Sequence, residues 1–195
     1  MRSLEQAWLT LGGMEFVACE TRSTSLSRTL RGLWPIGTAH AHIDDAPNRI
    51  SSPLVVDLAA TQEPAWFGSV TPPADRYCGL DIWIIPADED SRGLPEDARM
   101  DTRTFLLRGS WSPAGSDAPS ELRVIGADSA IVHLSFESPM ELSREQRRAS
   151  LTLQARPARW FRGLSLATTG GVEQSRAIME NIAAGFELHV NWPEN

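Results

Sequence analysis

The sequence contains no lysine, and all 18 of its basic residues are arginine. Without a lysine amine the chain cannot form a Schiff base, and it cannot supply the lysine of a P-loop. The net charge of −7 and the pI of about 5.1 argue against the clustered positive surface that binds nucleic acid. No run approaches the roughly 20 apolar residues of a membrane helix. We therefore expect a globular protein that neither binds nucleic acid nor inserts into a membrane.

The common catalytic motifs are also missing. The chain has no Gly-x-Ser-x-Gly turn for a nucleophilic serine and no His-Glu-x-x-His helix for a protease zinc ion. Its carboxylates occur as clusters in segments expected to be loops, so no general acid and base pair stands out. We therefore expect that the protein is not an enzyme.

The sequence has only two cysteines, Cys19 and Cys78, and whether they form a disulfide bears on whether the protein is exported. Neither has a second cysteine two or three residues away, as a zinc knuckle or a redox motif requires. The natural pairing is a disulfide between them, which favours export; two buried free thiols in a cytosolic protein are the alternative. Residues 1–5 lack the pattern of a secretory leader, so we expect a periplasmic or secreted protein in its mature form, with a leader already removed.

Hydrophobic and polar residues alternate through most of the sequence, which is the pattern of half-buried β-strands. Gly12 and Gly13 interrupt the first alternating segment, where they suit a β-bulge. A helix is expected over residues 172–184, with Gly185 after its end. We predict one domain over residues 1–195, an all-β fold that is an antiparallel, immunoglobulin-like β-sandwich with one short C-terminal helix. The strands are expected over residues 6–19, 76–85, 103–111, 121–125, 130–136, 150–155 and 186–190.

One acidic loop resembles a fragment of a calcium-binding loop. Asp88 and Asp90 lie two residues apart and Gly93 follows, which would provide hard oxygen ligands and a sharp turn. The distal glutamate of a helix-loop-helix calcium site is missing at the expected spacing. A solvated turn is therefore the better interpretation.

The four histidines are the most informative residues of the sequence. His40 and His42 form a His-Ala-His pair, and His133 and His189 lie in two further alternating segments. Residues i and i+2 of an extended segment share a face, so His40 and His42 could act as a chelate. Imidazole is the commonest metal ligand in proteins. The alternative is that each histidine is an ordinary half-buried strand residue with one hydrogen bond.

An all-histidine site would favour particular metals. Imidazole ligation suits copper, zinc and nickel, and the general affinity order places copper first. Zinc is the rival, because three histidines with one open position also form a zinc site. The seven tryptophans are unusual beside a single tyrosine, and most are expected to pack in the core or at its rim.

The C-terminal part of the sequence resembles a known family. The segment Trp160-Phe-Arg-Gly-Leu-Ser-Leu166, followed by Ile178-Met-Glu-Asn-Ile-Ala-Ala-Gly-Phe-Glu-Leu-His189, is similar to the tail of the MbnP-like proteins. These are periplasmic copper-binding proteins of the metallo-mystery pair family, which are partners of a di-haem peroxidase-like protein. The resemblance covers roughly the last 35 residues. Ser165 stands where the family has an aspartate.

The resemblance implies a β-sandwich, export, a di-haem peroxidase-like partner, and a copper site of histidines near an oxidised tryptophan (kynurenine). Within the similar segment only His189 corresponds to a family position. His133 and one of His40 or His42 are then the remaining ligands, because they are the only other histidines of the chain. Our first hypothesis is therefore an exported copper-binding protein, with metal ligands His40, His42, His133 and His189, that acts in copper acquisition, storage or delivery.

The second hypothesis is a metal-free β-sandwich. Such a protein would bind a partner or ligand through its proline-rich and acidic loops, where binding groups tend to gather, and its histidines would only pack. The two hypotheses differ in whether the four histidines come together in space.

Overall fold

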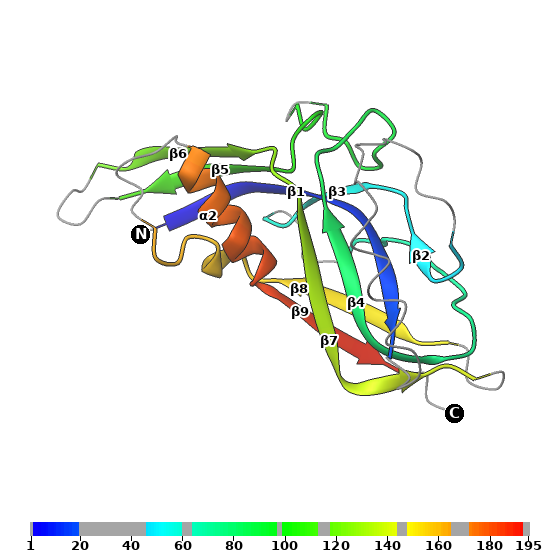
Figure 1. Cartoon of the computed structure of the whole chain (residues 1–195). Coiled ribbons are helices and arrows are strands. Elements are labelled where there is room, and N and C mark those ends of the chain that lie inside the picture. Colours follow the sequence, from blue (N-terminus) through cyan, green and yellow to red (C-terminus); the bar gives the residue numbers. More distant parts are fainter. Residues whose placement is uncertain are drawn as a thin grey trace, which may run out of the picture.

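The computed structural model describes residues 2–19, 46–59, 64–96, 99–112, 118–143, 148–164 and 172–192. Within these ranges the chain forms two antiparallel β-sheets, one of seven strands and one of two, with a helix packed against them (Figure 1). The predicted all-β sandwich with one short C-terminal helix is therefore confirmed. The strands are divided less evenly between the two layers than in an immunoglobulin domain.

The large sheet is built around one long strand, β1. Its strands follow the order β6-β5-β1-β4-β7, and β2 and β3 pair with β1 as well. β1 is shared because its first half pairs with β5 and its second half pairs with β4. The bounds of these strands are β1 (Arg2–Ala18), β2 (Arg49–Ile50), β3 (Leu54–Asp57), β4 (Arg76–Ile84), β5 (Phe105–Trp111), β6 (Ser120–Gly126) and β7 (Ala130–Glu141).

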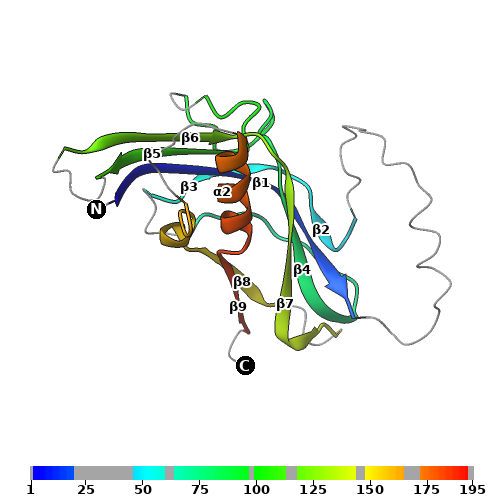
Figure 2. The same cartoon turned by 60° about the vertical axis from the view of Figure 1, so that its left-hand side comes forward.

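The bend in β1 occurs at the two glycines that the sequence marks as a bulge. The register of β1 against β4 shifts between Leu11 and Gly13. A Cβ atom at Gly13 would lie 2.6 Å from the carbonyl oxygen of Ile50, so glycine allows β2 to approach β1 at this point. Figure 2 shows β5 and β6 on one side of the bend and β4 and β7 on the other, with α2 in the angle between them.

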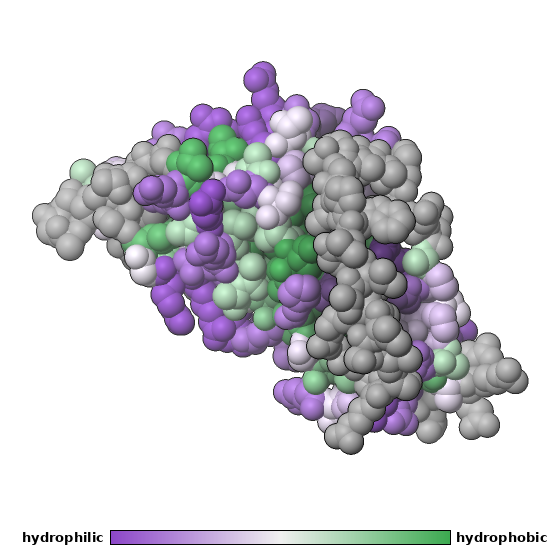
Figure 3. Space-filling view, in the orientation of Figure 1, coloured by the Kyte–Doolittle hydropathy of each residue, from purple (hydrophilic) through white to green (hydrophobic). Residues whose placement is uncertain are grey.

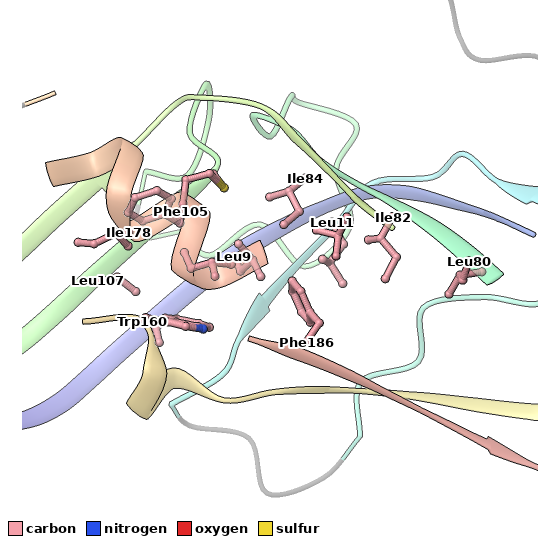
Figure 4. Close-up of a cluster of buried hydrophobic side chains, with 14 of the residues drawn as sticks. Leu9, Leu11, Leu80, Ile82, Ile84, Phe105, Leu107, Trp160, Ile178 and Phe186 are labelled. Carbon is pink, nitrogen blue, oxygen red and sulfur yellow. The ribbon is translucent and has the colours of Figure 1, made fainter. Parts of the chain in front are cut away.

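The second layer consists of β8 (Ser150–Ala155) and β9 (Phe186–Asn191), which pair with each other. Alternate residues of β9 pack against the core. The first is Phe186, which is buried, and the next is Leu188, which is half-buried. Figure 4 shows side chains from β1, β4, β5, α2 and the start of β9 gathered between the layers. The hydrophobic core therefore lies between the large sheet on one side and α2 with β9 on the other.

The helix α2 (Val172–Ala183) is fixed by apolar packing and by one asparagine. Ile178 and Ile182 are fully buried. The side-chain amide of Asn181 donates hydrogen bonds at 3.0 Å to the carbonyl oxygens of Trp160 and Arg162. Those two residues follow the 3-10 turn η1 (Pro157–Arg159), so Asn181 connects the helix to the segment that leaves β8.

The predicted strands and the observed ones differ mainly in length. The segment predicted over residues 130–136 continues to Glu141, because β7 is an edge strand and tolerates Pro139. The strand predicted from residue 103 begins at Phe105. The sequence did not indicate β2 and β3, which are too short to show a period. No helix in the described part of the chain is long and apolar enough to cross a membrane.

Candidate functional site

The structure describes two of the four histidines that the sequence predicts as metal ligands. His40 and His42 lie outside the described residues. His133 lies in β7 and His189 in β9, and the side chains of both are exposed. The site is therefore built from His133 and His189 and from the residues around each of them.

His133 is paired with a carboxylate on the neighbouring strand. It lies directly opposite Asp81 of β4 in the sheet register. Its Nδ1 atom is 2.7 Å from Oδ1 of Asp81. The His133 side chain is 73% exposed and that of Asp81 is 28% exposed, so the imidazole lies over a carboxylate that is held closer to the sheet. This pairing fixes the ring by Nδ1 and leaves Nε2 without a partner among the described residues.

The pair is part of a row of polar side chains that crosses four strands. Arg49 lies opposite Glu15, Glu15 lies opposite Asp81, and Asp81 lies opposite His133. Glu15 accepts a hydrogen bond from Arg49 at 2.6 Å and another from Asn48 at 3.1 Å. We call Arg49, Glu15, Asp81 and His133 the outer-face row, because their neighbours in β1, β4 and β7 point the opposite way, into the core.

Apolar side chains lie beside this row on the same face. Trp83 follows Asp81 by two residues, and its ring lies 5.1 Å from the guanidinium carbon of Arg49, a cation–π distance. Ile131 of β7 is 53% exposed and Val17 of β1 is 37% exposed. The outer face therefore combines one imidazole, two carboxylates, one guanidinium and exposed apolar surface.

His189 belongs to the other layer of the sandwich. It lies between Leu188 and Val190, which both pack against the core, so its side chain points away from the core. Its Nε2 atom is 3.3 Å from Oε1 of Gln154 in β8. Because the two layers face each other across the core, the outward direction of β9 is opposite to the outward direction of β7.

The structure therefore does not bring His133 and His189 together. Packed sheets lie about 10 Å apart, whereas histidines that share an ion each place a nitrogen about 2 Å from it. Among the residues that the structure describes, no three histidine, cysteine, aspartate or glutamate side chains are grouped so that they could hold a metal ion. A histidine site on either face would need ligands from outside the described residues.

A pocket lies elsewhere, between α2 and the start of β7. Its volume is about 410 Å³, and its lining includes Asp128, Arg176, Met179 and Glu180. The lining contains neither histidine nor cysteine. On the face shown in Figure 3, hydrophobic residues gather near the middle of the view, with hydrophilic residues above them and to their left.

The two cysteines are joined, as the sequence predicts. Cys19 and Cys78 form a disulfide with their Cα atoms 4.8 Å apart, which connects the end of β1 to β4. The backbone amide of Cys19 also donates to the carbonyl of Arg76 at 2.8 Å. Disulfides persist in oxidising compartments, so the structure is compatible with a secreted protein.

The acidic loop forms the solvated turn that the sequence favours. Ser91 donates through its hydroxyl to Oδ1 of Asp88 at 2.8 Å, and its own amide donates to the carbonyl of Asp88 at 3.2 Å. Asp88 and Asp90 are exposed, and Gly93 has a φ of 72°. The backbone amide of Asp88 in turn donates to the hydroxyl of Ser91 at 3.0 Å, so a side chain satisfies the backbone inside this turn.

Sequence reasoning missed Asp81 and Glu15 as parts of the site. Each occupies a polar position in an alternating strand, which shows only that it faces away from the core. Their link to His133 depends on the registers of two strand pairs, β1 with β4 and β4 with β7, whose members are far apart in the chain. Comparisons of the chain with protein-family models, with curated proteins and with solved structures find no match.

Proposed function

We propose that this protein is an exported copper-binding protein whose site forms on the outer face of the large sheet. The observation that carries the proposal is the 2.7 Å contact between Nδ1 of His133 and the Asp81 carboxylate. Metal-binding histidines typically donate their second ring N–H to a carboxylate, which fixes the tautomer and directs the other nitrogen at the ion. His133 has this arrangement on an exposed surface.

The length of the chain allows His40 and His42 to supply further ligands at this position. Strands β2, β1, β4 and β7 lie side by side at a spacing of about 4.8 Å, which places the backbone of β2 about 14 Å from that of His133. His42 precedes Asn48 by six residues, and six residues span up to about 20 Å. The proposed ligand set is therefore His133 with His40, His42 or both, and His189 is left out because it faces the other way.

The chemistry of these side chains favours copper, with zinc as the rival. Both cysteines are in the disulfide, so no thiolate is available, and imidazole is the ligand type on this face that favours copper. The oxidised tryptophan that the family resemblance implies would be sought at Trp83, which shares the outer face with His133. A periplasmic location, a di-haem peroxidase-like partner, and a role in copper acquisition, storage or delivery belong to the same proposal.

The proposal is tested by metal content. The full chain, purified without an affinity tag, is loaded with copper or zinc, desalted and analysed by mass spectrometry beside a His40→Ala/His42→Ala variant. We expect the unaltered protein to retain stoichiometric copper and the double variant to lose it. Retention of copper by the double variant, or the absence of retained metal in both proteins, would contradict the proposal.

A second candidate function is binding of a protein partner without metal. The exposed side chain of Ile131, which lies opposite Trp83 in the sheet register on the outer face, favours it, because exposed apolar residues grouped on one face often mark contact surfaces. Two results together would support this function over the first. The unaltered chain would retain neither copper nor zinc, and an Ile131→Asp variant would no longer capture a partner that the unaltered chain captures.

A further inference from the structure

The strand β6 is an edge of the large sheet that lacks two common protections against pairing with another chain. It is the last strand in the order β6-β5-β1-β4-β7, and Figure 1 shows it outermost on its side of the sheet. Prolines and bulges in edge strands block such pairing. The opposite edge strand, β7, contains Pro139 and shifts its register against β4. β6 contains no proline, and its register against β5 is continuous from Ser120 to Gly126.

Two carbonyl groups show which residues of β6 direct their backbone at this free edge. The carbonyl of Gly126 accepts at 2.8 Å from the amide of Thr104, which directly precedes β5. The carbonyl of Ile125 accepts at 3.3 Å from the hydroxyl of Ser175 in α2, so it is turned away from β5. The backbone groups of a strand point to its two sides at alternate residues. The residues at odd positions of β6 therefore direct their N–H and C=O groups out of the sheet.

Two of those residues, Glu121 and Arg123, carry opposite charges. Their side chains are exposed and lie on either side of the buried Leu122. Arg123 lies directly opposite Arg108 of β5, where like charges are unfavourable, and Arg108 bonds only the neutral Gln6, at 3.4 Å. Among the described residues, neither guanidinium and not the Glu121 carboxylate forms an ion pair. The charges beside the free edge are therefore not balanced within the described part of the chain.

We propose that a second copy of this chain pairs with β6 edge to edge and antiparallel, about a two-fold axis at Leu122. In this register Glu121 of each copy lies opposite Arg123 of the other, so two opposite-charge pairs form across the joined edges. The same residues direct their backbone at the second copy, and each pair exchanges both of its backbone hydrogen bonds. An axis at Glu121 or at Arg123 would instead place like charges opposite each other. Charge therefore selects one register.

The residues at the end of β6 fit the same register. Ile125 of one copy lies opposite Pro119 of the other. Proline has no N–H to donate, and the carbonyl of Ile125 already accepts from Ser175. The missing donor therefore leaves no carbonyl without a partner at this position.

The pairing also offsets the like-charge contact in the sheet. Each Arg123 gains the carboxylate of the second copy's Glu121 on the side away from Arg108. Because β6 and β7 lie at opposite edges of the large sheet, this contact is independent of the proposed copper site. The contact is small, so we expect a weak dimer with a dissociation constant in the micromolar range or above.

The experiment is sedimentation equilibrium of the full chain over a series of concentrations. The forms are the unaltered protein, Glu121→Arg, Arg123→Glu, and an equimolar mixture of these two variants. Either single change turns both attractive pairs into repulsive ones, so the dissociation constant should rise about 10- to 100-fold. The mixture should recover association, because an edge with two positive charges then meets an edge with two negative charges. Glu137→Arg in β7 makes the same charge change at the other edge and serves as the matched control.

Circular dichroism checks that each variant folds. Arg123→Glu places a carboxylate opposite Arg108 and should fold at least as well as the unaltered chain. If Glu121→Arg fails to fold, the double variant Glu121→Arg/Arg123→Glu replaces it, and this variant should dimerise as the unaltered chain does.

We expect a dimer that both single variants weaken, that the mixture or the double variant restores, and that Glu137→Arg leaves unchanged. A monomer at every concentration would overturn the inference. A dimer that Arg123→Glu leaves unchanged, or a loss that neither the mixture nor the double variant restores, would also overturn it.

Discussion

Cys19 at the end of β1 is bonded to Cys78 in β4, and the two residues are 59 positions apart in the chain. The bond joins two strands that already pair in the large sheet, since Ala18 lies opposite Tyr77. Its main effect is therefore on the unfolded chain, which it constrains by closing a long loop.

We expect loss of this disulfide to lower the free energy of unfolding by about 4 kcal/mol on the chain-entropy model. The measurement is guanidinium denaturation of the unaltered protein, with and without a thiol reductant, beside a Cys19→Ser/Cys78→Ser variant. The double variant should be equally stable in both conditions and should match the reduced protein. Equal stability of oxidised and reduced protein would show that the bond contributes nothing to folding.

The bend of β1 at Gly13 gives a second prediction. In Gly13→Ala the new methyl group would lie 2.6 Å from the carbonyl oxygen of Ile50 and 3.3 Å from the Trp83 ring. Backbone cannot give way as a side chain can, so we expect destabilisation of about 1–3 kcal/mol. Gly68→Ala is the matched control, because its methyl group would meet only the side chain of Ile50, at 3.1 Å. If the two variants prove equally stable by chemical denaturation, the close approach of β2 to β1 is not a constraint.

The only tyrosine of the chain gives a prediction at alkaline pH. Tyr77 is 3% exposed, and its hydroxyl donates to the carbonyl of Pro73 at 3.0 Å. Burial raises the pKa of Tyr77 above its usual value of 10.0, and the charge of Asp75 raises it further. The folded chain therefore holds its phenolic proton at a pH where the unfolded chain has lost it.

The stability of the protein should consequently fall once the pH rises above about 10, where the unfolded tyrosine ionises, and should keep falling until the folded tyrosine ionises as well. A Tyr77→Phe variant has no such proton and should lack this part of the decline. Denaturant unfolding at a series of pH values compares the two proteins. A decline of equal steepness in both would mean that Tyr77 does not contribute to it.

Strand patterns could be predicted from the sequence where alternation is long. Residues 150–155 form β8 with the bounds that the pattern gives, and the bulge at Gly12 and Gly13 lies where two glycines interrupt an alternating segment. β2 could not be found because two residues carry no period. Its presence depends on the closeness of Asn48 and Arg49 to Glu15, which is a contact between segments 33 and 34 residues apart.

The arrangement of the histidines could not be predicted from alternation alone. In their strands, His133 and His189 both occupy positions that face away from the hydrophobic core of the protein. The sequence does not show that β7 and β9 belong to different layers. Two side chains that face away from the core on different layers point in opposite directions. The pairing of His133 with Asp81 could not be predicted either, because Asp81 becomes its neighbour only through the register of β4 against β7.

Native mass spectrometry of copper-loaded His133→Ala and His189→Ala proteins, beside the unaltered chain, shows which of the two histidines belongs to the copper site. Both side chains are exposed, so neither change should disturb folding. We predict that His189→Ala retains copper as the unaltered protein does and that His133→Ala loses it, because the proposed site lies on the face of β4 and β7. Loss of copper in His189→Ala with retention in His133→Ala would contradict a site on the outer face of the large sheet.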